Sequence, residues 1–321
     1  MKIKLVGFWD YNNYTQITLL EYRSIISQSF DFEFYDPYKS YDRQSILFVC
    51  NHYQYYQNQT VIDQLVDAGY KLAFESLLEK QSSSPHTQPT VLHIVAGKSE
   101  QPPVNTLEVP LYFWYHENRL SNYQIDRTYC PDKKFLLMMN FARLFRDEIY
   151  NKFSPILEQG LYSYVDRGIK IDGDIEHDST GYKNYWDRWD RYINPAWYNR
   201  TEINVVVESQ MSSNELFITE KTMKPLALEQ PFVMLGCAGT LDFLRHSGFE
   251  TYDNLFDETY DSKMNRLDLV YEQIKNYDLR GYDQLTRDKM THNAELFHDR
   301  QAVDRSFQAT LIDPLLEFAN G

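Results

Sequence analysis

The chain has 321 residues, enough for two ordinary domains or one large one. Its hydrophobic fraction of 43% is typical of a globular protein. Its formal net charge of -14 excludes a general binder of DNA, RNA or anionic lipid, although a local basic site for a phosphate group remains compatible with it. The three cysteines, Cys50, Cys130 and Cys237, follow no CxxC spacing, which excludes a zinc signature and a disulfide framework.

The N-terminal sequence MKIKLVGFWDYNN has a short apolar run that ends in polar residues, which is typical of a first strand and not of a signal peptide. No segment has the apolar length needed to span a bilayer. Together with the sparse cysteines, these features predict a protein of the reducing cytoplasm.

The first half of the chain alternates short apolar runs with segments of helical spacing. The predicted strands cover residues 2–8, 45–50, 70–74 and 91–95, and the predicted helices cover residues 17–27 and 61–68. Residues 80–89 are polar and contain Ser and Pro, as in a loop. Strands that alternate with helices predict a doubly wound parallel sheet.

A polar break over residues 122–133 contains Pro131, and we place a domain boundary there, between residues 1–128 and 129–321. The pattern then restarts. Strands are predicted over residues 135–139, 161–165, 203–207 and 231–235, helices over 141–157 and 224–228, and mainly helix from 262 onward. Residues 168–197 are irregular and rich in Tyr, Trp and Asp, which is typical of a long functional or surface loop.

Residues 205–239 carry the most chemical information. The strand ends in Glu208 and Ser209, at the sheet edge where open α/β sheets bind ligands. Thr219 is suited to cap the next helix, with Glu220 and Lys221 in its first turn. Free N–H groups and a lysine there favour a diphosphate, and a carboxylate beside them can accept hydrogen bonds from ribose hydroxyls. Judged by spacing alone, a capped surface helix with a solvated Glu and Lys is favoured instead.

The helix that follows residues 135–139 carries two arginines. Arg143 and Arg146 are three residues apart and therefore share a helix face, from which two guanidinium groups can clamp a diphosphate. The alternative is a pair of solvated arginines facing Asp147 and Glu148. Pro225 in the other segment lacks the N–H that would bond to the carbonyl of Lys221, which predicts a helix that kinks there or starts near residue 224.

The string ITEKTMKPLALEQPFVMLG resembles the donor-site motif of a group of phage and bacterial glycosyltransferases and is similar, more distantly, to the fucosyltransferase motif. The resemblance implies that Glu220 contacts the nucleotide ribose and that Lys221 contacts the diphosphate. KKFLLMMNFARLFRDEIYNKF resembles the first strand and helix of the same donor domain, which implies a strand that ends in Asn140 and an Arg146 that reaches the phosphates. Arg143 is its nearest rival, because the usual Asn-Arg-Arg-Pro-like run is replaced by Asn-Phe-Ala-Arg.

This resemblance covers residues 133–260 and implies an α/β fold of the GT-B type, with two Rossmann-like doubly wound domains facing each other across a cleft. Residues 1–128 would form the acceptor side, and residues 129–321 would form the nucleotide-sugar donor domain with terminal helices. The implied reaction moves a hexose or pentose from a nucleotide-diphosphate sugar to a hydroxyl of a glycan, a lipid-linked sugar or a modified DNA base. The fucosyltransferase similarity points to a GDP-sugar, while base and sugar stay open. No metal is expected, and a phage-encoded enzyme would act in the host cytoplasm.

An inverting transferase needs a general base for the acceptor hydroxyl. Glu75, Asp10 and His52 follow predicted N-terminal strands and are ranked in that order, each with the alternative of an ordinary loop or cap residue. Glu208 is predicted to contact the donor sugar, and aromatic residues of the segment 182–198 are predicted to stack on an acceptor or to form a packed flap.

Two alternatives to this function remain. A noncatalytic nucleotide- or glycan-binding module would keep the ribose and phosphate groups without a base in the opposing domain. A GT-A transferase would use Asp172 and Asp174, whose Asp-Gly-Asp spacing mimics the DxD motif that binds a divalent ion, although acidic pairs are frequent in an acidic chain.

Overall fold

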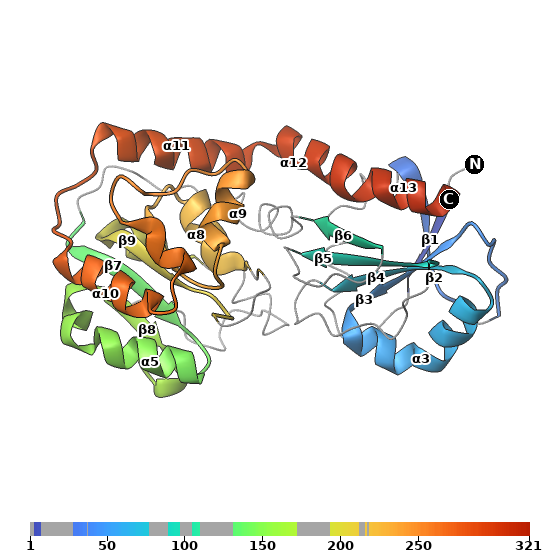
Figure 1. Ribbon diagram of the computed structural model, residues 1–321, viewed down its shortest axis with the longest axis horizontal. Coiled ribbons are helices and arrows are strands. Elements are labelled where there is room, and N and C mark those ends of the chain that lie inside the picture. Colours follow the sequence, from blue (N-terminus) through green and yellow to red (C-terminus); the bar gives the residue numbers. More distant parts are fainter. Residues whose placement is uncertain are drawn as a thin grey trace. The chain divides into compact units, whose positions relative to one another are not determined.

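The computed structural model describes residues 3–7, 28–36, 38–76, 89–96, 105–109, 131–171, 193–211, 216 and 218–321. The chain divides into two compact units, one formed by residues 1–115 with 300–321 and the other by residues 116–299. Each unit is built on a sheet whose described strands are all parallel (Figure 1). The expectation of an α/β protein with two parallel sheets is confirmed.

The first unit contains a six-stranded sheet in the order β2-β1-β3-β4-β5-β6. Its strands are β1 (Ile3–Gly7), β2 (Phe30–Phe34), β3 (Ile46–Cys50), β4 (Lys71–Ser76), β5 (Val91–Ala96) and β6 (Thr106–Val109). Four of them match the predicted strands, because buried parallel strands are continuous apolar runs. β2 and β6 were not predicted, and the predicted helix over residues 17–27 lies outside the described residues. Helix α3 (Asn51–Asp67) covers one face of the sheet, and its Ile62 and Val66 belong to the hydrophobic core on that face.

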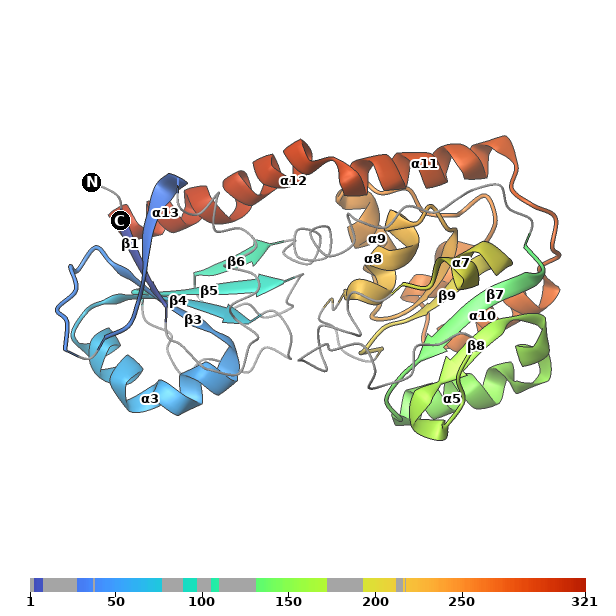
Figure 2. The same ribbon diagram turned by 180° about the vertical axis from the view of Figure 1, so that it is seen from behind.

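The opposite face of this sheet is covered by the C-terminal end of the chain, which comprises α12 (Arg300–Phe307), a π-helical turn η4 (Gln308–Ile312) and α13 (Asp313–Asn320) (Figure 2). Their apolar side chains share one core cluster with the sheet: Val303, Phe307, Leu311, Ile312, Leu315 and Ala319 against Phe30, Ile46, Ala73, Leu92, Ile94 and Val109. The sequence-based division assigns residues 300–321 to the C-terminal domain. They instead complete the first unit, because their apolar face is what buries this side of the sheet.

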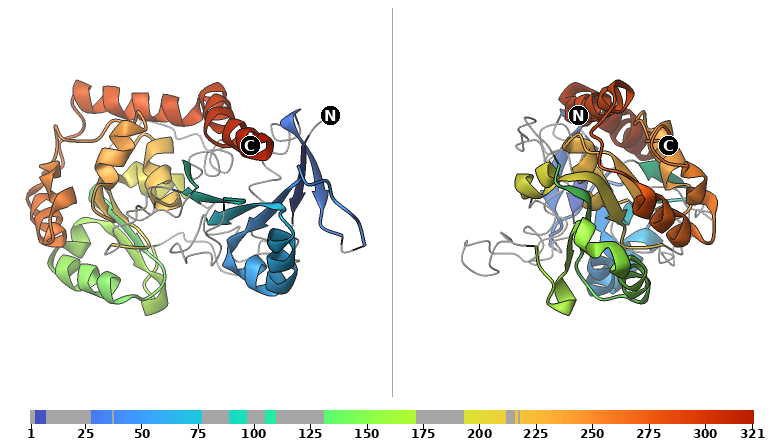
Figure 3. Two further views of the ribbon diagram at one scale, coloured as in Figure 1. Left: turned by 45° about the vertical axis from the view of Figure 1, so that its right-hand side comes forward. Right: turned by 90° about the vertical axis from the view of Figure 1, so that its left-hand side faces the viewer.

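The second unit contains a four-stranded sheet in the order β10-β9-β7-β8. The strands are β7 (Lys133–Met139), β8 (Leu161–Tyr164), β9 (Thr201–Val207) and β10 (Phe232–Leu235), close to the predicted positions. All seven residues of β9 are buried. α5 (Leu144–Phe153) and α10 (Arg266–Asn276) pack together, whereas α8 (Glu220–Ala227) and α11 (Gln284–His298) lie on the other side of the sheet from α5 (Figure 3).

Two predicted helices of this unit have different bounds in the structure. The single helix expected over residues 141–157 is α5 followed by a 3-10 helix, η1 (Ser154–Gln159), because Pro155 has no N–H for the α-helical bond. α8 begins at Glu220 and continues through Pro225, so the start near residue 224 is wrong.

The strand order of the second sheet defines its ligand-binding edge. β7 pairs with β8 on one side and with β9 on the other. The chain therefore adds β8 on one side of β7 and then adds β9 and β10 on the opposite side, so the strand order reverses between β7 and β9. Ligands of open parallel sheets bind outside the carboxyl ends of the strands at such a switch point. Asn140 follows β7 and Glu208 follows β9, which places both residues at this edge. No helix in the described part of the chain is both long and apolar enough to cross a membrane.

Candidate functional site

Two cationic side chains from different helices meet on Ser209, directly after β9. The guanidinium of Arg143, at the N-cap of α5, donates a hydrogen bond to the carbonyl oxygen of Ser209 (2.5 Å). The ammonium of Lys221, in the first turn of α8, donates to the hydroxyl oxygen of Ser209 (3.3 Å). The ends of β7 and β9 and the start of α8 therefore converge at the switch point of the sheet.

The first turn of α8 is arranged around Thr219, its N-cap residue. The Thr219 hydroxyl oxygen accepts hydrogen bonds from the backbone N–H of Lys221 (3.4 Å) and from its ammonium (3.1 Å). The same ammonium forms an ion pair with the carboxylate of Glu220 (2.7 Å). Both side chains of this pair keep part of their surface exposed, 25% for Lys221 and 16% for Glu220, so a ligand can reach them.

Arg146 is the buried cation of the site. Its side chain is 2% exposed, and its Nη1 donates to the carbonyl of Phe141 (3.0 Å), while its Nε–H is buried without a hydrogen-bond partner in the described part of the chain. Burial, aided by the like charge of Arg143, lowers the pKa of Arg146 to about 10, and the charges of Glu208 and Glu220 act in the opposite direction. The group thus remains cationic at neutral pH, and its Nε–H, which has no partner among the described residues, can donate to an anion.

Glu208 is fully buried and lies at the centre of the hydrogen bonds beneath the site. Its carboxylate accepts from the backbone N–H of Ser209 (3.2 Å) and Thr219 (2.9 Å), and from the hydroxyls of Thr219 and Thr222 (2.6 Å each). A contact of Glu208 with a donor sugar, as predicted from the sequence, would require this enclosed carboxylate to become exposed.

The segment between β7 and α5 is fastened by the turn after β8. The carbonyl of Asn140 accepts from the N–H of Asp166 (3.1 Å), and the Asp166 carboxylate accepts from the N–H of Ala142 (2.7 Å). Asp147 pairs with Arg167 and not with the arginines of its own helix. That ion pair, together with a hydrogen bond from Tyr164, lowers the pKa of Asp147. Asp166 is the contributor that the sequence analysis did not single out, because only its hydrogen bonds to the segment after β7 reveal it.

The candidate catalytic side chains of the first unit lie outside the described part of the chain. Glu75 lies in β4, in register with Cys50 of β3 and Ile94 of β5, and His52 lies in the first turn of α3, but the structure does not describe these side chains. Asp10 lies outside the described residues.

The predicted metal and aromatic sites lie mostly beyond the described ranges as well. Asp172 and Asp174 are outside them, and the residues that are described contain no group of three or more His, Cys, Asp or Glu side chains arranged to hold a metal ion. Of the aromatic segment 182–198, Trp197 and Tyr198 are described, and both are buried in α7 (Pro195–Arg200).

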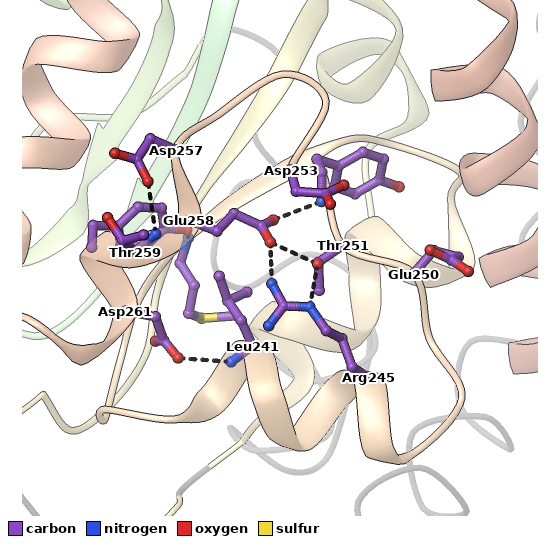
Figure 4. Close-up of polar contacts among 12 residues, drawn as sticks. Leu241, Arg245, Glu250, Thr251, Asp253, Asp257, Glu258, Thr259 and Asp261 are labelled. Carbon is purple, nitrogen blue, oxygen red and sulfur yellow. Dashed lines mark hydrogen bonds and ion pairs between the residues drawn. The ribbon is translucent and has the colours of Figure 1, made fainter.

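A second polar cluster follows β10, where α9 (Thr240–His246) meets the 3-10 helix η3 (Glu258–Ser262) (Figure 4). The carboxylate of Glu258 lies between Arg245 and Thr251, accepting from both. The Asp261 carboxylate accepts from the N–H of Leu241 (3.1 Å), and burial raises the pKa of Asp261. Because these groups are bonded to one another, the cluster fastens α9 to η3, and we do not assign it a ligand.

No family model matches the sequence, and no curated protein matches it either. Among solved structures, an alpha1,3-fucosyltransferase with GDP is similar at 12% identity and a TM-score of 0.44, over 94% of this chain and 92% of that one. The T4 phage protein BGT in complex with UDP and Mn2+ is similar at 11% identity and a TM-score of 0.45, over 98% of this chain and 99% of that one. The alpha1,3-fucosyltransferase with GDP-fucose is similar at 13% identity and a TM-score of 0.43, over 93% of this chain and 91% of that one.

Proposed function

We propose that the second unit binds the nucleoside diphosphate part of a sugar donor and that the protein is a glycosyltransferase of the GT-B type. The observation that carries the proposal is Arg146, a buried guanidinium whose Nε–H has no hydrogen-bond partner among the described residues. A buried donor without a partner costs about 1–3 kcal/mol and calls for an explanation. An anionic ligand bound beside Arg143 and Lys221 would supply that explanation, because it would accept the hydrogen bond of this N–H.

The same groups suit the chemistry of the reaction. As the glycosidic bond breaks, negative charge develops on the departing diphosphate, and preorganised cations with helix N–H groups stabilise it. Arg143 and Lys221 now donate to neutral oxygens of Ser209. A phosphate is a stronger acceptor because hydrogen bonds between charged groups are about twice as strong as neutral ones. Glu220 would exchange its bond with Lys221 for bonds from the ribose hydroxyls.

The remaining assignments are proposals that rest on the sequence. Glu75 or Asp10 would be the general base, the donor would be a GDP-sugar, and the acceptor would be a hydroxyl of a glycan or a modified DNA base. The proposed reaction needs no metal, and the proposed location is the cytoplasm, that of the host if a phage encodes the protein. EDTA sensitivity of sugar transfer would instead favour the metal-dependent reading with Asp172 and Asp174.

A binding experiment tests the donor site. Thermal shift and calorimetry with UDP, GDP, CDP, ADP and dTDP would identify the base, because a ligand of the native state raises its apparent stability. Lys221→Ala, Glu220→Ala and Arg146→Ala should each weaken binding at least tenfold, and Arg143→Ala should weaken it less. Lys152→Ala is the matched control, since this lysine lies on α5 but pairs with Asp268. Unchanged affinity in all four site variants would refute the assignment.

A second experiment separates an enzyme from a binding module. Wild-type protein is incubated with the nucleotide sugar whose nucleotide binds best, and release of the nucleoside diphosphate is followed with and without an acceptor glycan. Turnover that Lys221→Ala abolishes supports a transferase. Tight binding without hydrolysis or transfer to any acceptor supports the noncatalytic module.

A further inference from the structure

The hydrogen bonds around Thr219 have a fixed direction. Its hydroxyl has one proton and three polar partners: the Glu208 carboxylate at 2.6 Å, the Lys221 ammonium at 3.1 Å and the Lys221 backbone N–H at 3.4 Å. A carboxylate only accepts hydrogen bonds, and an ammonium only donates them. The Thr219 proton therefore points to Glu208, and its lone pairs point to Lys221.

The Glu208 carboxylate can impose this direction, because burial and hydrogen bonds fix its position. It has no exposed area, and its two oxygens take four hydrogen bonds. Its position is also fixed from the strand, where its N–H donates to the carbonyl of Leu235 in β10 (2.9 Å). A Cβ added to Gly236 would lie 3.4 Å from the Cβ and Cγ of Glu208, so little free space surrounds the side chain there.

We propose that Glu208 is a positioning residue of the donor site, which acts through the Thr219 hydroxyl to hold the Lys221 ammonium where a diphosphate binds. This inference rests on the proposed function and replaces a direct contact of Glu208 with the sugar. The Glu208 charge also offsets the buried charge of Arg146, so the same carboxylate supports two of the three cations. Neither cation forms a direct ion pair with Glu208: Lys221 pairs with Glu220, and Arg146 donates to the carbonyl of Phe141.

The chain offers a matched pair of variants for the test. Thr219 and Thr222 both donate to Glu208 at 2.6 Å, but only Thr219 also contacts Lys221. Titration of GDP and UDP into the full chain should therefore show about tenfold weaker binding for Thr219→Val and less than threefold weaker binding for Thr222→Val. Thr219→Ser, which keeps the hydroxyl, should restore the affinity.

A double-mutant cycle excludes a general effect of the lost helix cap. In a Lys221→Ala background, Thr219→Val should weaken nucleotide binding no further, because the Thr219 hydroxyl is proposed to affect binding only through the Lys221 ammonium. Glu208→Gln should resemble Thr219→Val, since an amide donor would turn the Thr219 proton toward Lys221. If Glu208→Gln does not fold, the comparison of Thr219→Val with Thr222→Val still tests the inference.

Equal losses for Thr219→Val and Thr222→Val would overturn the inference, as would a Thr219→Val loss that persists without Lys221. Failure of the proposed function would give a different result in the same binding experiment. In that case the wild type binds neither nucleotide, or Lys221→Ala binds them as tightly as the wild type does.

Discussion

Arg146 combines a stability cost with a proposed binding role. Burial lowers the pKa of Arg146 well below its ordinary value, to about 10, which corresponds to roughly 3 kcal/mol against the charged form. This cost is present below about pH 10 and fades as the pH rises further, because the folded state then loses its proton before the unfolded chain does. An anion bound beside Arg146 would offset the same cost at neutral pH.

We therefore expect Arg146→Met to separate stability from binding. Replacing a desolvated charge by an apolar side chain of similar length is often neutral or stabilising. The melting temperature without ligand should stay the same or rise at pH 7.5, while nucleoside diphosphate affinity falls at least tenfold. A melting temperature several degrees lower, measured by differential scanning fluorimetry, would contradict this account of the site.

Glu202 is a buried carboxyl at the other end of β9. Its Oε2 accepts a long hydrogen bond from the N–H of Arg280 (3.4 Å), while Oε1 has no hydrogen-bond partner in the described part of the chain. Burial raises the pKa of Glu202. The protonated form is therefore favoured in the folded state, and the cost of ionising it grows as the pH rises above the unfolded value of about 4.3.

Glu202→Gln should remove that cost. We expect a higher free energy of unfolding in urea at pH 7.5 and a smaller gain at pH 4.5, where the unfolded chain is itself partly protonated. The exposed Glu158→Gln serves as the control and should change little at either pH. A gain that is equal at both pH values would show that packing, and not ionisation, is responsible.

The turn from η1 into β8 passes so close to β7 that it has no room for a side chain. A Cβ added to Gly160 would lie 2.4 Å from a ring carbon of Phe135, which is fully buried in β7 and packs edge-on against Phe153 of α5. The glycine is thus required here for space and not for its backbone angles, since its φ is -122.

Gly160→Ala is therefore expected to destabilise the protein by about 3 kcal/mol, the upper range for an overpacked core. Gly168→Ala is the control, because its φ of +73 strains the backbone but nothing lies within 4 Å of the added Cβ. That strain costs only about 1 kcal/mol. Urea unfolding of the two variants would reveal the difference, and equal losses would rule out a steric role of Gly160.

Residues 300–321 complete the first unit, although they lie at the other end of the chain from the rest of it. Phe307 is 1% exposed and lies in the same core cluster as Phe30 and Ile94, which are far away in the sequence. The ammonium of Lys71 adds a polar contact, donating to the carbonyl of Ala319 (2.8 Å). The sheet of the first unit thus depends on the last helices of the chain for one of its faces.

Phe307→Ala should cost about 3–5 kcal/mol, the range for truncating a buried aromatic side chain. Hydrogen exchange should become faster in β2 and β5 of the first unit and stay unchanged in β7 and β9 of the second. Arg305→Ala, an exposed change on the same helix, should have little effect. Faster exchange confined to the second unit would contradict the assignment of residues 300–321.

Local sequence features, such as continuous apolar runs and capping side chains, were enough to predict the α/β class, most strand positions and the Thr219 cap of α8. The sequence also indicated Arg143, Arg146, Glu220 and Lys221 as chemically relevant, although their binding role stays a prediction. The folded structure was needed to show that Ser209 contacts both Arg143 and Lys221, that Glu208 is enclosed, and that residues 300–321 complete the first unit. Each of these depends on strand order and on packing between residues distant in the chain, which a local pattern does not encode.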